Sequence, residues 1–242
     1  MYERRAELEY PQPVARPDPS VDRKFERVAE LLRARLPCRS FLDVGCGDGR
    51  YLPLLAEVEP RPERIVATDI SERILETALA TAAAAGLEPT VVRANLEALP
   101  VGDDSFELVL CTQVIEHLLD VRAGIAELAR VVAPEGTLVL TTDNSRNAVT
   151  KALWAPRQAV VRILRVQGRK HRVHFPESEF APEDLAALVD HAGLDVEELG
   201  TARFLAPPPF GPRTQRLLNR LDKRMSPHLR GDILYVVATN PG

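Results

Sequence analysis

The sequence is poor in aromatic side chains and in cysteine, and it contains no long apolar run. Aromatic residues make up 5% of the 242 residues, which leaves few surfaces on which nucleic-acid bases can stack. The three cysteines, Cys38, Cys46 and Cys111, lack the spacing of a metal site or a disulfide framework, so we expect reduced, structural thiols. Because no apolar run reaches membrane-spanning length and no charged-then-apolar leader opens the sequence, we expect a cytoplasmic protein.

Acidic side chains are nearly absent from two segments, although the formal net charge of the whole chain is −4. Residues 144–172 contain basic side chains and no acidic one, and residues 203–230 contain basic side chains and a single acid, Asp222. The remainder of the chain is therefore strongly acidic. We expect two basic insertions, at about 144–180 and 203–230, which favour an anionic, lipid-like or glycosidic partner over a cationic one.

Short apolar runs alternate with helical patterns along most of the chain. The runs at 40–44, 64–69, 91–92, 106–111, 137–142, 194–199 and 233–239 predict strands. Helical patterns cover 21–36, 50–58, 71–85, 121–132 and 184–191. Such alternation predicts an α/β fold, a mostly parallel, doubly wound sheet with helices on both faces. The proline-rich residues 1–20 predict an extended N-terminal arm, and 21–242 a single domain with the two insertions.

Three glycines follow the first predicted strand in the stretch Asp43-Val44-Gly45-Cys46-Gly47-Asp48-Gly49. Glycine permits positive φ and lets the backbone approach a ligand, so this turn is typical of a nucleotide-like ligand site. A site for NAD prefers the spacing G-x-G-x-x-G, and an early carboxylate would repel a pyrophosphate. The same carboxylate suits a ligand that carries an ammonium and a sulfonium. Asp69, which ends the second predicted strand, lies where a ribose-binding acid is expected.

At these residues the chain resembles the class I S-adenosylmethionine-dependent methyltransferases, and more narrowly their small-molecule branch of type 11. The stretches VRANLEALPVGDDSFELVLCTQVIEHL, at 92–118, and RVVAPEGTLVLTT, at 130–142, extend the similarity over residues 40–142. The resemblance implies S-adenosyl-L-methionine as the cofactor and a seven-stranded, Rossmann-like sheet. It also implies that the seventh strand runs antiparallel beside the fifth.

Bringing the strand ends together around one cleft predicts the residues that hold this cofactor. Asp43 and the backbone of Gly45, Cys46, Gly47 and Gly49 are expected at its amino-acid end. Asp69 is expected to hold the ribose, Ile70 to pack on the adenine, and Asn95 and Leu96 to meet the adenine edge. Cys111 to Gln113 are expected to close over the methionine portion. Singly, each residue is equally compatible with an ordinary turn, cap or loop.

Glu116 and His117 follow the fourth predicted strand closely and are the leading candidates for catalysis. A hydroxyl acceptor must lose a proton, and histidine titrates near neutral pH. His117 is also compatible with a helix cap. His174, at the exit of the first basic insertion, is a third candidate. Some relatives bind a metal through Glu-x-x-Glu-His, but the first of these positions is Gln113, and an amide is a weaker ligand for a hard cation. We therefore predict no metal.

The sequence favours a methyltransferase that acts on a hydroxyl of a sugar, polyketide, quinone precursor or lipid. The N/D-P-P-Y/F signature of methyltransferases for DNA bases is absent from residues 111–114, so DNA is not expected as a partner. Three alternatives stay open: an RNA methyltransferase, a cofactor-binding partner protein without catalysis, and, less favoured, an NAD-dependent oxidoreductase. The segment 153–166 mixes aliphatic side chains with arginines, so it fits a lid helix, a membrane-surface helix or a floor for an anionic substrate. Homodimer formation also stays open.

Overall fold

The computed structural model describes residues 23–147, 178–202 and 231–242. The predicted N-terminal arm, most of both basic insertions and His174 lie outside these residues. None of the described helices is both long and apolar enough to cross a lipid bilayer.

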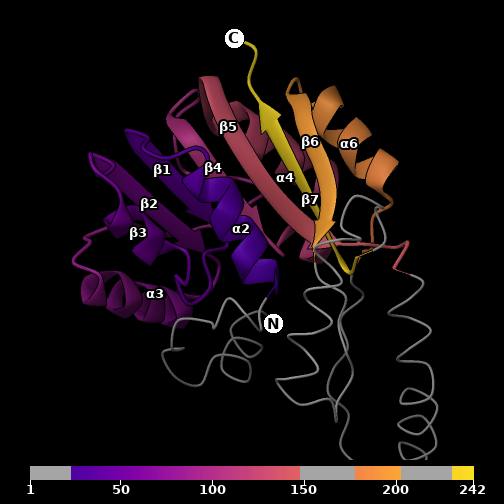
Figure 1. The fold of residues 1–242 in the computed structure, drawn as a ribbon. Helices are drawn as coiled ribbons and strands as arrows, with labels where there is room; N and C mark the ends of the chain where they lie inside the picture. Colours follow the sequence, from indigo (N-terminus) through magenta and orange to yellow (C-terminus); the bar gives the residue numbers. More distant parts are fainter. Residues whose placement is uncertain (1–22, 148–177, 203–230) are drawn as a thin grey trace, which may run out of the picture.

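The described strands form one sheet in the order β3-β2-β1-β4-β5-β7-β6 (Figure 1). Their bounds are Ser40–Val44 (β1), Arg64–Asp69 (β2), Thr90–Arg93 (β3), Phe106–Thr112 (β4), Val132–Asp143 (β5), Asp195–Ala202 (β6) and Ile233–Thr239 (β7). The five strands from β3 to β5 are parallel, and β7 runs antiparallel to both β5 and β6. The predicted mostly parallel sheet is confirmed, and so is the reversed seventh strand. Strand order changes direction between β1 and β4, which is where ligands bind in open α/β sheets.

Helices cover both faces of this sheet (Figure 1). The helical elements are α2 (Arg23–Arg33), η1 (Leu52–Glu57), α3 (Glu72–Ala84), η2 (Ile115–His117), α4 (Val121–Val131) and α6 (Pro182–His191), with η marking 3₁₀ helices. Side chains alternate along β1, so that Phe41 packs with α2, η1 and α3, whereas Leu42 packs with α4 and α6. Two apolar cores, one on each face, hold the carboxyl ends of the strands in fixed positions.

The segment after the glycines differs from the predicted helix. Gly45, Gly47 and Gly49 have φ values of +67°, +54° and +72°, which an α-helix does not allow. The chain therefore makes an irregular loop before a single short 3₁₀ helix at Leu52–Glu57. Helix α3 begins after Ser71 as predicted, but the Ser71 hydroxyl makes no capping hydrogen bond. The Ser71 amide instead donates to the carboxylate of Asp69 at 3.0 Å.

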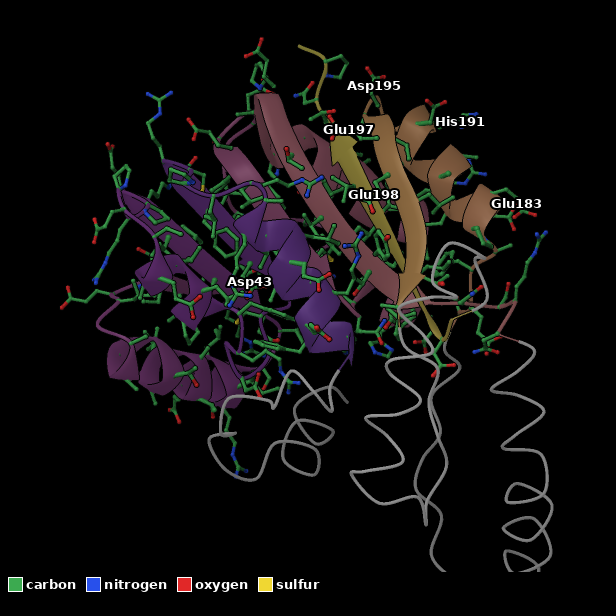
Figure 2. The ribbon with its side chains drawn as sticks, in the orientation of Figure 1. Asp43, Glu183, His191, Asp195, Glu197 and Glu198 are labelled. Carbon is green, nitrogen blue, oxygen red and sulfur yellow. The ribbon has the colours of Figure 1, made fainter. Side chains whose placement is uncertain are left out.

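Helix α2 is fastened to the antiparallel end of the sheet by Arg27. Its guanidinium donates to the Tyr235 hydroxyl at 2.8 Å, lies 4.7 Å from the centre of the Tyr235 ring and pairs with Glu198. Glu198 lies on β6 (Figure 2). The Tyr235 hydroxyl donates in turn to Glu198 at 2.9 Å. A helix at the start of the domain is thus fixed against its last two strands.

Gly200 on β6 leaves the space that the Tyr235 ring occupies. A Cβ at this position would lie 2.3 Å from the Tyr235 hydroxyl oxygen. We expect Gly200→Ala to lower the free energy of unfolding by about 1–3 kcal/mol, because the ring must leave Arg27 and Glu198 to avoid the clash. Urea denaturation measures the change. Gly102→Ala is the matched control, since its Cβ would meet only the Ser105 hydroxyl, at 3.1 Å; equal stability of the two variants would contradict the prediction.

Candidate functional site

A cavity of about 400 Å³ opens at the carboxyl edge of the sheet, where β1 and β4 lie side by side. The loops after β1, β2, β3 and β4, the end of β5 and the first turn of α2 form its wall. Among the residues predicted for the cofactor, the wall contains Gly45, Cys46, Gly47, Asp69, Ile70, Asn95, Leu96 and Gln113, together with the candidate catalytic residues Glu116 and His117.

Three of the predicted residues lie behind this wall instead of in it. Asp43 and Cys111 are buried within the sheet, with 1% and 0% of their surfaces exposed. Gly49 faces helix α3, where a Cβ would lie 2.9 Å from the Cα of Ala78. The structure therefore does not bring Asp43, Gly49 or Cys111 to the cavity surface. His174 lies outside the described residues.

The glycine loop is shaped by the loop that follows β4. A Cβ at Gly45 would lie 2.3 Å from a methyl group of Val114, so these two loops approach more closely than any other side chain allows. Gln113, next to Val114, also has a positive φ, of +57°. Residues other than glycine rarely adopt this conformation, and it is common at binding sites. The close approach fixes the loop after β1 against the loop after β4.

Asp69 joins the glycine loop to the end of β2. Its carboxylate accepts the amide of Gly47 at 3.2 Å and the amide of Ser71 at 3.0 Å. Burial raises its pKa, while these amide contacts oppose the rise. Each carboxylate oxygen can accept a further hydrogen bond. Asp69 therefore supports the start of α3 and also lines the cavity, so the two roles that the sequence suggested are compatible.

The carboxyl group of Asp43 is buried. Neither of its oxygens has a hydrogen-bond partner among the residues that the structure describes. Burial, followed by the charges of Asp69 and Asp48, raises its pKa to about 8. The adjacent Asp48 differs, because its carboxylate accepts two hydrogen bonds from Arg50, at 2.9 and 2.8 Å. Asp43 is thus protonated at neutral pH in the cofactor-free protein, and an approaching positive charge favours its ionisation.

Glu116, in η2, lines the same cavity. It is 2% exposed, and the hydroxyl of Thr142 donates to its carboxyl group at 2.9 Å. Burial, with a smaller contribution from the charge of Asp143, raises its pKa to about 8, while its own backbone amide, the Thr142 hydroxyl and the charge of Lys24 oppose the rise. His117, the last residue of η2, is partly exposed, and its amide donates to the carbonyl of Val114 at 3.0 Å. Both candidate catalytic residues therefore line the cavity, and a hydrogen bond joins Glu116 to the end of β5.

Comparison with known proteins agrees with this geometry. Residues 42–140 match the family model described as "Methyltransferase domain". A relative from Mycobacterium tuberculosis, described as a probable S-adenosylmethionine-dependent methyltransferase, is 35% identical over 122 residues, which cover 50% of this chain and 42% of the relative. A ubiquinone biosynthesis O-methyltransferase of Hahella chejuensis is 29% identical over 168 residues, covering 69% of this chain and 67% of that protein.

Residues 42–140 are a class I S-adenosylmethionine-dependent methyltransferase domain. The fold agrees, since the N-methyltransferase NodS from Bradyrhizobium japonicum, solved with S-adenosyl-L-homocysteine, superimposes with a TM-score of 0.61 at 17% identity, covering 99% of this chain and 98% of NodS. The resemblance that the sequence indicated is confirmed. This chain spans less than half of the length of the mycobacterial relative.

The methyltransferase domain receives part of its cavity wall from residues outside the family match. Lys24 on α2 and Asp143 at the end of β5 both line the cavity, and their charges act on Glu116. Sequence reasoning missed Lys24, because no motif links α2 to the cavity and only its packing places it there. It also missed Glu97, although its position two residues after Asn95 is a local signal for a turn.

Metal ligation has no geometric support in the described part of the methyltransferase domain. No group of three or more His, Cys, Asp or Glu side chains among these residues lies close enough to hold a metal ion. Gln113, which replaces the first carboxylate of the Glu-x-x-Glu-His pattern, has a buried amide nitrogen without a hydrogen-bond partner in this part of the chain.

Proposed function

We propose that this chain transfers the methyl group of S-adenosyl-L-methionine to a hydroxyl group of a small molecule. One observation carries the proposal: a single cavity brings the glycine loop and Asp69 together with Glu116, a carboxyl group whose burial raises its pKa to about 8. The glycine loop and Asp69 suit the binding of a nucleoside with an amino-acid tail. Glu116 suits the removal of a proton from the acceptor. The relatives named as ubiquinone biosynthesis O-methyltransferases support an oxygen acceptor.

The residues of the wall fit the parts of the cofactor. Asp69 would accept hydrogen bonds from the ribose hydroxyls, since two amides already orient its carboxylate. Asn95 and Leu96 would meet the adenine, and Ile70 would pack on its face. The backbone of Gly45, Cys46 and Gly47 and the side chain of Gln113 would surround the methionine portion. Asp43, which is buried and does not line the cavity, would act on the bound positive charge through space rather than by contact.

The protein's own contribution to the reaction is positioning and proton removal. When bound, the cofactor supplies an activated methyl group, so the wall has only to align the acceptor with it. Glu116 is the group that we assign to remove the acceptor's proton, and Thr142 orients its carboxyl group. His117, beside it in the wall, is the second candidate. Basic residues in the two insertions make an anionic, lipid-like or glycosidic acceptor the preferred class.

Asp69→Ala tests the cofactor assignment. We expect the affinity for S-adenosylhomocysteine to fall about 10–100-fold, because two hydrogen bonds to a charged acceptor are lost. Isothermal titration calorimetry measures the change, and thermal denaturation confirms that the variant is folded. Asp69→Asn, which keeps one accepting oxygen, is expected to show an intermediate loss. Undiminished affinity of Asp69→Ala would remove the ribose assignment.

Incubation with labelled S-adenosylmethionine and fractionated metabolites from the source organism tests the transfer itself. We expect label in a small molecule, attached through an ether or ester oxygen. Cofactor binding without transfer to any fraction would favour the non-catalytic partner, and label in RNA would favour the RNA methyltransferase.

A further inference from the structure

Glu97 connects two loops at the adenine end of the proposed cofactor site. One oxygen of its carboxylate accepts the amides of Leu119 and Asp120, at 2.9 and 2.8 Å. The other accepts the side-chain amide nitrogen of Asn95 at 3.2 Å. Asn95 returns a contact, since its side-chain oxygen accepts the amide of Glu97 at 3.2 Å. Asn95, Glu97 and Leu119 all line the cavity.

These contacts fix which way the Asn95 amide points. The two ends of an asparagine amide have nearly the same shape, but one donates and the other accepts hydrogen bonds. A carboxylate only accepts, so the nitrogen of Asn95 must face Glu97 and its oxygen must face the backbone amide of Glu97. Reversing the amide would place its oxygen against the carboxylate. Each end of the amide keeps capacity for one more hydrogen bond.

We propose that Glu97 sets the base specificity of the cavity by fixing the orientation of the Asn95 amide, an inference that rests on the proposed function. Adenine presents an amino donor beside a ring-nitrogen acceptor. Hypoxanthine, which has oxygen in place of the amino group, presents a carbonyl acceptor beside a ring N–H donor. An amide held in one orientation complements one of these edges and opposes the other. Glu97 is thus a positioning residue that makes the site select adenine.

Other contacts support the same two loops independently of Glu97. Glu127 on α4 accepts the amide of Leu99 at 2.7 Å and pairs with Arg130. Asp120 caps α4 through the amide of Ala123, at 3.0 Å. The loops therefore keep their fold when the carboxylate of Glu97 is replaced, and the orientation of Asn95 can be changed separately.

Glu97→Gln removes the contact that holds that orientation. A glutamine has one accepting oxygen, which the amides of Leu119 and Asp120 require, so its nitrogen would face Asn95. The Asn95 nitrogen then faces a donor in its present orientation, and in the reversed orientation it would face the backbone amide of residue 97, so neither orientation of the amide is held as it is in the wild type. We expect the ratio of affinities for S-adenosylhomocysteine and S-inosylhomocysteine, its hypoxanthine counterpart, to fall at least about tenfold relative to wild type, through both weaker adenine and stronger hypoxanthine binding. Calorimetry with the two ligands measures this ratio.

One further variant separates positioning from general loop damage. Asp120→Ala removes the α4 cap but keeps the backbone contact to Glu97, so the ratio is expected to stay at the wild-type value. An unchanged ratio in Glu97→Gln, with both affinities falling together, would overturn the proposal, as would a collapsed ratio in Asp120→Ala. A wild-type protein that binds neither ligand would overturn the proposed function itself.

Discussion

Asp43→Asn is expected to increase the stability of the cofactor-free protein at pH 7 by about 2 kcal/mol. In the unfolded chain the carboxyl group ionises with its ordinary pKa of 3.8, whereas in the folded protein the pKa is about 8. Keeping the proton in the folded state at pH 7 costs about 4 kcal/mol. The asparagine avoids this cost, but its amide is buried without hydrogen-bond partners, which destabilises the folded variant by about 2 kcal/mol. The net gain in the free energy of unfolding is therefore about 2 kcal/mol.

The pH dependence of this difference identifies its cause. Below about pH 4, Asp43 is protonated in both states, and its ionisation does not affect stability. Between pH 4 and 8 the unfolded chain has released the proton and the folded protein retains it. Each pH unit therefore lowers the free energy of unfolding of the wild type by about 1.4 kcal/mol relative to the variant. Above pH 8 both states are ionised and the gap stops growing.

Urea denaturation of both proteins between pH 4 and 9 measures this gap. Glu116, whose pKa is also raised, affects both proteins equally and cancels in the comparison. Asp48→Asn is the matched control, since it removes the carboxylate that pairs with Arg50. It is expected to destabilise the protein by about 1–3 kcal/mol. A gap that does not grow with pH would show that Asp43 is already ionised in the folded state.

Glu116→Gln is expected to reduce methyl transfer about 10²–10³-fold, because a glutamine cannot remove a proton from the acceptor. Cofactor affinity should change little. In the wild type, the rate is expected to rise with pH until Glu116 is ionised, near pH 8. An unperturbed imidazole titrates near pH 6.5, so a rise centred there, with loss of activity in His117→Ala, would assign the base to His117.

Nuclear magnetic resonance of ¹³C-labelled glutamate side chains measures the Glu116 pKa without an acceptor. We expect one resonance, absent in Glu116→Gln, to titrate near pH 8. S-adenosylmethionine should lower this pKa more than S-adenosylhomocysteine does, because only the former carries a sulfonium charge. Thr142→Val should raise it, since the hydroxyl stabilises the ionised form. Titration with the other glutamates near their ordinary pKa would contradict the assignment.

The strands and most helices could be predicted from the sequence because their signals are local. Apolar runs defined β1, β2 and β7 to the residue, and the alternation of strands and helices predicted a parallel sheet. The glycine loop was less predictable. Its three positive φ values exclude an α-helix there, and the helix that follows is a short 3₁₀ turn instead.

Motif spacing predicted most of the residues of the candidate site. It did not distinguish a residue that lines the cavity from one that is buried behind the cavity wall. Asp69 and Asp43 are both acids at the ends of neighbouring strands, yet only Asp69 lines the cavity. The difference comes from the turn after each strand. Asp69 is oriented by the amides of Gly47 and Ser71, whereas Asp43 is buried in β1 and makes no such contact among the described residues.

The sequence by itself determined the order of the elements and the loops that meet at the cavity, because periodicity and glycine spacing act over a few residues, and its resemblance to a known family indicated the class of domain. Only the tertiary structure decided that Lys24 reaches the cavity, that Asp43 and Glu116 are buried with raised pKa values, and that Glu97 holds Asn95. Burial and hydrogen bonding depend on neighbours that are distant in the chain. The tertiary structure therefore sets the protonation and orientation of the side chains that the motifs supply.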